Sequence, residues 1–257
     1  MSVAGLLPAA ALGVVYALGV ARCARPWPWW RTAAALGAVV ALAVALGPLD
    51  GPADRHLSAH MGQHAIVGVL APALVALSAP VRLALAATRP RGRRALASLL
   101  HAAPLRALLA PPVAVGIAAA TVALLHLPSV MDAVERHGAL HALDHAALFW
   151  TATLCWVALL GVDPVPAAPG PIGLLIAGAA WMVPMAAVGA LYANADHLLV
   201  GAYAAGGDTL AGQRDAGTIM ILGGPLLLVP FVLAAAGHAL WLEEDRQRRR
   251  ERAEGLR

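Results

Sequence analysis

The chain has 257 residues, of which 60% are hydrophobic and 12% are charged, and its mean hydropathy is +0.74. Soluble domains are not this apolar, so the composition excludes them and indicates a polytopic membrane protein. The net charge is +4 and all 18 basic residues are arginine; their clustering indicates membrane orientation rather than a nucleic-acid surface. Cys23 and Cys155 are far apart in the sequence, so neither a disulfide framework nor a cysteine metal site is expected.

Seven apolar segments are candidates for crossing a bilayer, which takes about 20 residues. They cover residues 3–21, 33–48, 57–79, 107–127, 138–160, 172–193 and 217–240. We therefore predict an all-α bundle of seven transmembrane helices. Residues 1–240 form a single domain in this interpretation, and residues 241–257 form a basic cytoplasmic tail. No basic residue precedes the first segment, which favours an uncleaved span over a secretory signal.

The arginines determine the predicted orientation. Fifteen of the 18 fall on one side of the predicted membrane, in residues 22–31, 82–106 and 246–257. Positive residues remain cytoplasmic, so the N-terminus is predicted outside and the C-terminus inside. This orientation puts eight of the ten histidines at or near the outer ends of spans.

Two short stretches, 81 positions apart, carry the same polar pattern at the start of the third and fifth spans. The first contains His56, His60, Gln63 and His64, and the second contains His137, His141, Asp144 and His145. Residues three and four apart lie on one face of a helix, so each stretch forms a polar stripe that enters the membrane. Both spans run from outside to inside, and their stripes can face each other. Ionisable residues inside a membrane are rare and usually functional.

The helical spacing limits which histidines can share an ion. Residues i and i+4 have Cβ atoms about 5–6 Å apart, whereas a run of eight residues covers about 12 Å. We therefore predict a site in which His60 and His64 of one helix meet His141 and His145 of the other. A nitrogen-rich site of this kind suits copper, zinc, iron or nickel.

Several neighbouring residues are weaker candidates. Asp144 is expected to orient His141, Gln63 to orient His60, and His126 to be an auxiliary ligand. The thioethers of Met61 and Met220 favour Cu(I), although methionines in membrane helices more often only fill space. His56, His137 and His197 are weaker still, because a lone histidine at a membrane interface is usually solvated.

The residues also resemble a known family. His60-Met61-Gly62-Gln63-His64, the later Ser78-Ala79-Pro80, His126-Leu127-Pro128 and His141-Ala142-Leu143-Asp144-His145 are similar to the signature of the CtaG-type cytochrome c oxidase assembly factors. Gln213-Arg214-Asp215-Ala216-Gly217, followed by Met220, resembles the outer loop of that family before its last span. The likeness extends over residues from about 50 to 235.

This resemblance implies a bacterial inner-membrane protein, not an enzyme, that helps to build haem-copper oxidase. The expected function is that of a metallochaperone, which delivers copper to the catalytic subunit of the oxidase and receives it from a periplasmic donor. Membrane lipids are expected partners, and nucleic acid is not. The histidines of the family fall on positions 60, 64, 126, 141 and 145, whereas His56 and His137 lie outside the shared pattern.

Three other functions compete with this one. A membrane di-iron hydroxylase or desaturase also uses His-x-x-x-His boxes, but those boxes usually include adjacent histidines and face the cytosol. A haem-binding membrane protein would use histidines on facing helices as axial ligands. A channel or proton relay could also use a polar stripe. Zinc and iron remain alternative metals in this interpretation, with Cu(I) favoured.

Overall fold

The computed structural model describes residues 3–164 and 169–253, and within these ranges the chain forms helices and no strands. The predicted all-α class is therefore confirmed at the level of secondary structure. Residues 254–257 of the predicted tail lie outside the described ranges. The rest of that tail continues the last long helix rather than forming a separate segment.

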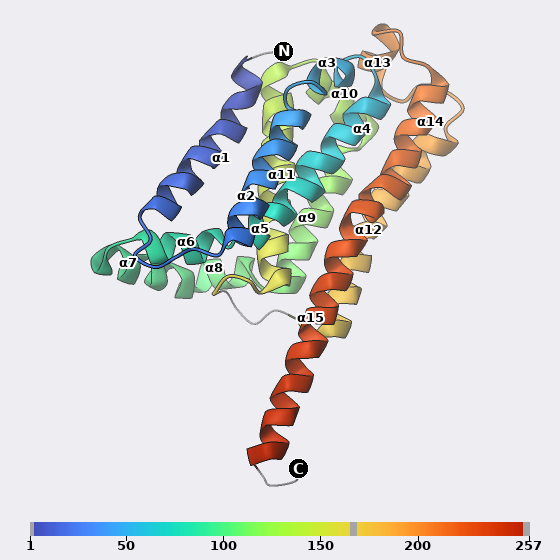
Figure 1. The fold of residues 1–257 in the computed structure, drawn as a ribbon. Coiled ribbons are helices and arrows are strands. Elements are labelled where there is room, and N and C mark those ends of the chain that lie inside the picture. The colour runs from blue at the N-terminus through green and yellow to red at the C-terminus, as the bar shows by residue number, and fades with distance from the viewer. Residues whose placement is uncertain (1–2, 165–168, 254–257) are drawn as a thin grey trace.

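The longer helices form rods that run roughly alongside one another (Figure 1). Their bounds are α1 (Val3–Ala21), α2 (Trp29–Ala45), α4–η1–α5 (Leu57–Leu77), α9 (Pro111–Leu125), α11 (Gly138–Leu160), α12 (Pro171–Asn194) and α14–η2–α15 (Leu210–Ala253). Short helices gather at the two ends of these rods. α3 (Asp50–Ala53), α10 (Pro128–Glu135) and α13 (Gly201–Ala205) lie at one end, and α6 (Pro80–Ala87), α7 (Pro90–His101) and α8 (Ala103–Leu108) lie at the other.

Four of the rods within the described ranges are long and apolar enough to cross a membrane. They are Leu57–Leu77, Gly138–Leu160, Pro171–Asn194 and Leu210–Glu251. The helices α9 and α10 form a fifth candidate together, bent by 74°, and the apolar parts of α1 and α2 (Leu6–Ala21 and Trp29–Ala45) are shorter. The predicted segment 107–127 is thus too long at its start, since α8 ends at Leu108 and Pro111 begins a new helix. A proline lacks a backbone N–H, which suits it to the first turn of a helix.

The end that carries α6, α7 and α8 is the arginine-rich end. The chain turns there at Ala79, whose φ of 56° lies in the left-handed region, and α6 begins at once with Pro80. Asp163 accepts hydrogen bonds from the backbone N–H groups of Val81 and Arg82 and so caps α6. Burial raises the pKa of the Asp163 carboxyl, while those two N–H donors act to lower it.

The helix α11 lies at the centre of the bundle, packed against α9, α5 and η1. Its Trp156 is fully buried and donates a hydrogen bond from Nε1 to the Val69 carbonyl in η1 (3.2 Å). The π-helix η1 (Ile66–Leu70) interrupts the third rod directly after His64, and a second π-helix, η2 (Ile219–Gly223), interrupts the last rod. Such π-bulges are frequent at functional sites.

Candidate metal centre

Four histidine rings from α4 and α11 converge near the end of the bundle that carries α3, α10 and α13. We call His60, His64, His141 and His145 the histidine cluster. The ring centroids of His60 and His64 are 4.0 Å apart, and those of His141 and His145 are 4.5 Å apart. Between the helices, the His60–His141 and His64–His145 centroids are 5.2 Å and 5.1 Å apart. The two stripes therefore face each other, as the sequence predicts.

Two carboxylates lie within this cluster. Asp144 is 2% exposed, and its Oδ2 is 3.0 Å from His64 Nε2. It thus lies against His64 rather than His141, the partner expected from the sequence. Glu135 ends α10, and its Oε1 is 3.6 Å from His60 Nε2 and 3.8 Å from His141 Nδ1.

These side chains form two groups in which all the ligand atoms lie within 4.8 Å of one another. One group is His60, His64, Asp144 and His145, and the other is His60, Glu135 and His141. Glu135 was not among the residues predicted from the sequence. The only signal was its position as an acidic residue just before the second histidine stretch, and helix α10, which carries it, was not predicted.

Many nitrogen and oxygen atoms of the cluster are buried without a hydrogen-bond partner in the described part of the chain. They are both ring nitrogens of His60, Nε2 of His64, His141 and His145, Oε1 of Glu135 and both carboxylate oxygens of Asp144. Buried polar atoms are nearly always hydrogen-bonded, because an unpaired one retains its full desolvation cost. Bound cations would satisfy those of these atoms that carry lone pairs, whereas the N–H of a neutral imidazole needs an acceptor. The donor set of imidazole and carboxylate suits copper, zinc or iron.

His126 links the Val122 carbonyl to the His64 ring through its two ring nitrogens, and so orients that ring. Its Nδ1 lies 2.9 Å from the Val122 carbonyl, which can only accept, so Nδ1 carries the hydrogen. In a neutral ring, Nε2 is then an acceptor, and it lies 3.0 Å from His64 Nδ1, which must donate. This leaves His64 Nε2 with a free lone pair that faces Asp144. His126 therefore stands behind His64 with both nitrogens engaged, and neither group of ligand atoms includes it.

Other predicted residues have different partners. Gln63 is buried, but its Nε2 donates to the Ala45 carbonyl (2.9 Å) and to Asp50 (3.4 Å) rather than orienting His60. His56 is largely exposed and lies 3.7 Å from Asp208. His137 is exposed and contacts the Ala133 carbonyl (3.0 Å). The exposed His197 contacts its neighbour Asp196.

The loop before the last rod holds the start of α4 in place. Asp208 Oδ2 accepts a hydrogen bond from the Leu57 N–H, which has no partner within its own helix (2.9 Å). Gln213 accepts from the Leu199 N–H (2.7 Å) and donates to the His197 carbonyl (3.0 Å). Asp208 thereby caps the first turn of α4, the helix that carries His60, whereas Gln213 joins α14 to the segment that precedes it.

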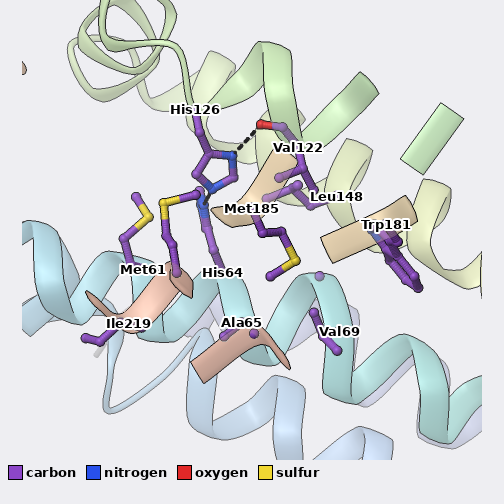
Figure 2. Close-up of a pocket in the computed structure, with 13 residues that line it drawn as sticks. Met61, His64, Ala65, Val69, Val122, His126, Leu148, Trp181, Met185 and Ile219 are labelled. Atoms are coloured by element: carbon purple, nitrogen blue, oxygen red, sulfur yellow. Dashed lines mark hydrogen bonds between the residues drawn. The ribbon is translucent and has the colours of Figure 1, made fainter. Parts of the chain in front are cut away.

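A small apolar cavity of about 30 Å³ lies on the far side of His64. Met61, Met185 and Met220 line it together with His64 and His126, and all five are buried. Figure 2 shows Met61 and Met185 on either side of His64, with His126 above it. Thioether sulfurs are soft ligands, so this cavity adds soft donors next to the imidazole cluster.

A larger groove of about 950 Å³ reaches the cluster from the side of α1 and α2. Its lining is mainly apolar, with His141 and His145 among the few polar residues. Asp50 and Asp54 also line it. The groove therefore gives an ion or a partner a route to the exposed side of the cluster, past two acidic residues.

The model of the family described as cytochrome c oxidase caa3 assembly factor matches residues 14–241. The chain belongs to this family. It is also 30% identical over 185 residues to two uncharacterized proteins, one from Mycobacterium bovis and one from Mycobacterium tuberculosis. Each match covers 65% of this chain but only 28% of the relative, so the chain corresponds to a minor part of either protein. No solved structure matches the chain significantly.

Proposed function

We propose that this assembly factor binds copper at the histidine cluster and passes it to the catalytic subunit of cytochrome c oxidase. Family membership supports the assembly role. The proposed metal site is supported by one observation above all. Several buried nitrogen and oxygen atoms on α4, α10 and α11 have no hydrogen-bond partner in the described part of the chain. The ligands in this proposal are His60, His64, His141 and His145, with Asp144 beside His64.

The surroundings of the cluster support copper in particular. Three methionines lie next to His64 in the small apolar cavity, and thioethers select Cu(I) over harder ions. His126 acts through His64 rather than as a direct ligand, because its hydrogen bonds hold the free nitrogen of His64 toward Asp144. A periplasmic copper donor would load the site through the groove that contains His141 and His145.

The protein is proposed to lie in the bacterial inner membrane with seven spans, its N-terminus outside and its C-terminus inside. Figure 1 supports this orientation, because the helices that surround the cluster and the arginine-rich helices α6–α8 lie at opposite ends of the bundle. Positive residues remain on the cytoplasmic side, which puts the cluster on the outside, where copper is acquired.

A purified-protein experiment tests the metal. The wild-type protein in detergent is equilibrated with Cu(I) and its copper content is measured against a variant with all four cluster histidines changed to alanine. We expect bound copper in the wild type and its loss in the variant. Equal copper contents would contradict the proposal.

Deletion in the source bacterium tests the delivery step, with oxidase activity and oxidase copper content measured together. We expect both to fall and to be restored by the wild-type gene but not by the four-alanine variant. Lost activity with normal oxidase copper would instead indicate chaperoning of the subunit itself.

A di-iron enzyme is the second candidate, and the two carboxylates beside the histidines favour it. Such sites combine imidazole and carboxylate ligands. The metal content of the protein purified from its source decides between the two, because iron in place of copper would support the enzyme.

A further inference from the structure

We infer that the cluster binds two ions in two stacked sites, the second of which uses Glu135. This inference extends the proposed function. It shares with that proposal only the assumption that the histidine cluster binds metal. The ligands divide into two layers, each with one histidine from α4, one from α11 and one carboxylate. The outer layer is His60, His141 and Glu135, and the inner layer is His64, His145 and Asp144. His60 lies between them, because its ligand atom is also within 4.8 Å of those of the inner layer.

Helix geometry separates the layers. In each helix the two histidines are four residues apart, which corresponds to a rise of about 6 Å. A single ion with bonds of about 2.0–2.2 Å does not reach all four imidazoles. Among the described residues, no group of ligand atoms within 4.8 Å of one another contains both His64 and His141.

The outer layer has the spacing of ligands around one ion. Two ligands bound at about 2.0–2.2 Å lie about 3.3–3.8 Å apart for bond angles between tetrahedral and trigonal. Glu135 Oε1 is 3.6 Å from His60 Nε2 and 3.8 Å from His141 Nδ1. These distances are too long for hydrogen bonds and match that range.

One carboxylate oxygen of Glu135 has a hydrogen-bonding neighbour, and the other is available to an ion. Oε2 lies 3.1 Å from the Tyr203 hydroxyl, which also lies 3.1 Å from the Ala53 carbonyl. Oε1 is buried without a partner in the described structure, and so are both nitrogens of the fully buried His60. Each ion would then have one carboxylate and two imidazoles as ligands. This is the donor set of zinc sites that keep a fourth coordination position open.

The electrostatics also favour two ions. Two carboxylates are buried among the imidazoles, and an ionised carboxylate needs a cationic partner when it is buried. One ion in the inner layer would leave Glu135 without a cation. The groove that Asp50 and Asp54 line reaches both layers, because His141 and His145 line it too.

Metal stoichiometry tests the inference independently of copper delivery. Zn(II) is used as a redox-inert probe, and bound metal per chain is measured after equilibration and gel filtration in detergent. We expect two ions in the wild type, one in Glu135→Gln and one in Asp144→Asn. The matched control is Asp132→Asn, on the same helix as Glu135, which keeps an acceptor for the Ala202 N–H and should still bind two.

A second experiment tests by EPR spectroscopy whether the two ions lie close together. Two Cu(II) ions about 6 Å apart couple through their magnetic dipoles, so the EPR spectrum of the loaded wild type should be broadened and should show a half-field transition. In Glu135→Gln the remaining ion is isolated, and the half-field transition should be absent. If that variant does not fold, His141→Asn removes the same ion from another helix.

One ion per chain in the wild type would overturn the inference. So would two ions in Glu135→Gln or an uncoupled Cu(II) signal at two ions per chain. Two ions with normal oxidase assembly in a deletion strain would instead remove the proposed function and leave the two-layer site intact.

Discussion

Replacing His126 with phenylalanine tests how the His64 ring is oriented. Phenylalanine keeps an aromatic ring in the buried position but removes the acceptor that lies 3.0 Å from His64 Nδ1. His64 then loses the contact that holds its free nitrogen toward Asp144. Removing such an outer partner typically costs about 10–100-fold in metal affinity, which corresponds to about 1.4–2.8 kcal/mol.

The affinity is measured by competition between the detergent-solubilised protein and a chromophoric Zn(II) chelator. The matched control is His101→Phe, because His101 Nδ1 also contacts the carbonyl four residues earlier (2.7 Å) but lies exposed on α7 at the arginine-rich end. We expect the control to bind as the wild type does. The reasoning fails if His126→Phe binds with wild-type affinity. It also fails if that variant loses a whole ion, since His126 would then be a direct ligand.

Two further predictions concern the methionines of the small apolar cavity and the orientation of the protein in the membrane. Changing Met61 and Met220 together to leucine preserves the apolar lining, so Cu(I) affinity should fall while Zn(II) affinity is retained; an equal fall in both would indicate a packing defect. Ser98 in α7 and Ala133 in α10 are both exposed, so each can be changed singly to cysteine. A membrane-impermeant reagent should label intact spheroplasts only at position 133, and labelling at position 98 instead would reverse the proposed orientation.

The two histidine stripes were predictable because each depends on a local rule. The i, i+4 spacing puts His60 with His64 and His141 with His145 on single helix faces, whatever the rest of the fold does. The bounds of α11 match the predicted span 138–160 for the same reason, since a long uninterrupted apolar segment determines one helix. The choice of facing partners followed from the shared direction of the third and fifth spans.

The partners of the polar residues were not predictable from spacing. Asp144 is three residues from His141 in sequence, yet it contacts His64 on the other helix, because rotation of α11 in the bundle determines which side chains it faces. Gln63 likewise donates to Ala45 and Asp50, on a segment whose position depends on the preceding loop.

The sequence by itself determined the membrane character, the helical class, the arginine asymmetry and the two histidine stripes, since each follows from composition or from a period of 3.6 residues. Only the tertiary structure brought Glu135 to His60 and His141, and Met185 to the cavity beside His64. These contacts join residues on different helices, and their geometry depends on how α10 folds back at a 74° bend and on how α12 packs against η2. No local pattern encodes such long-range packing, so the partners of the two carboxylates became visible only in the folded chain.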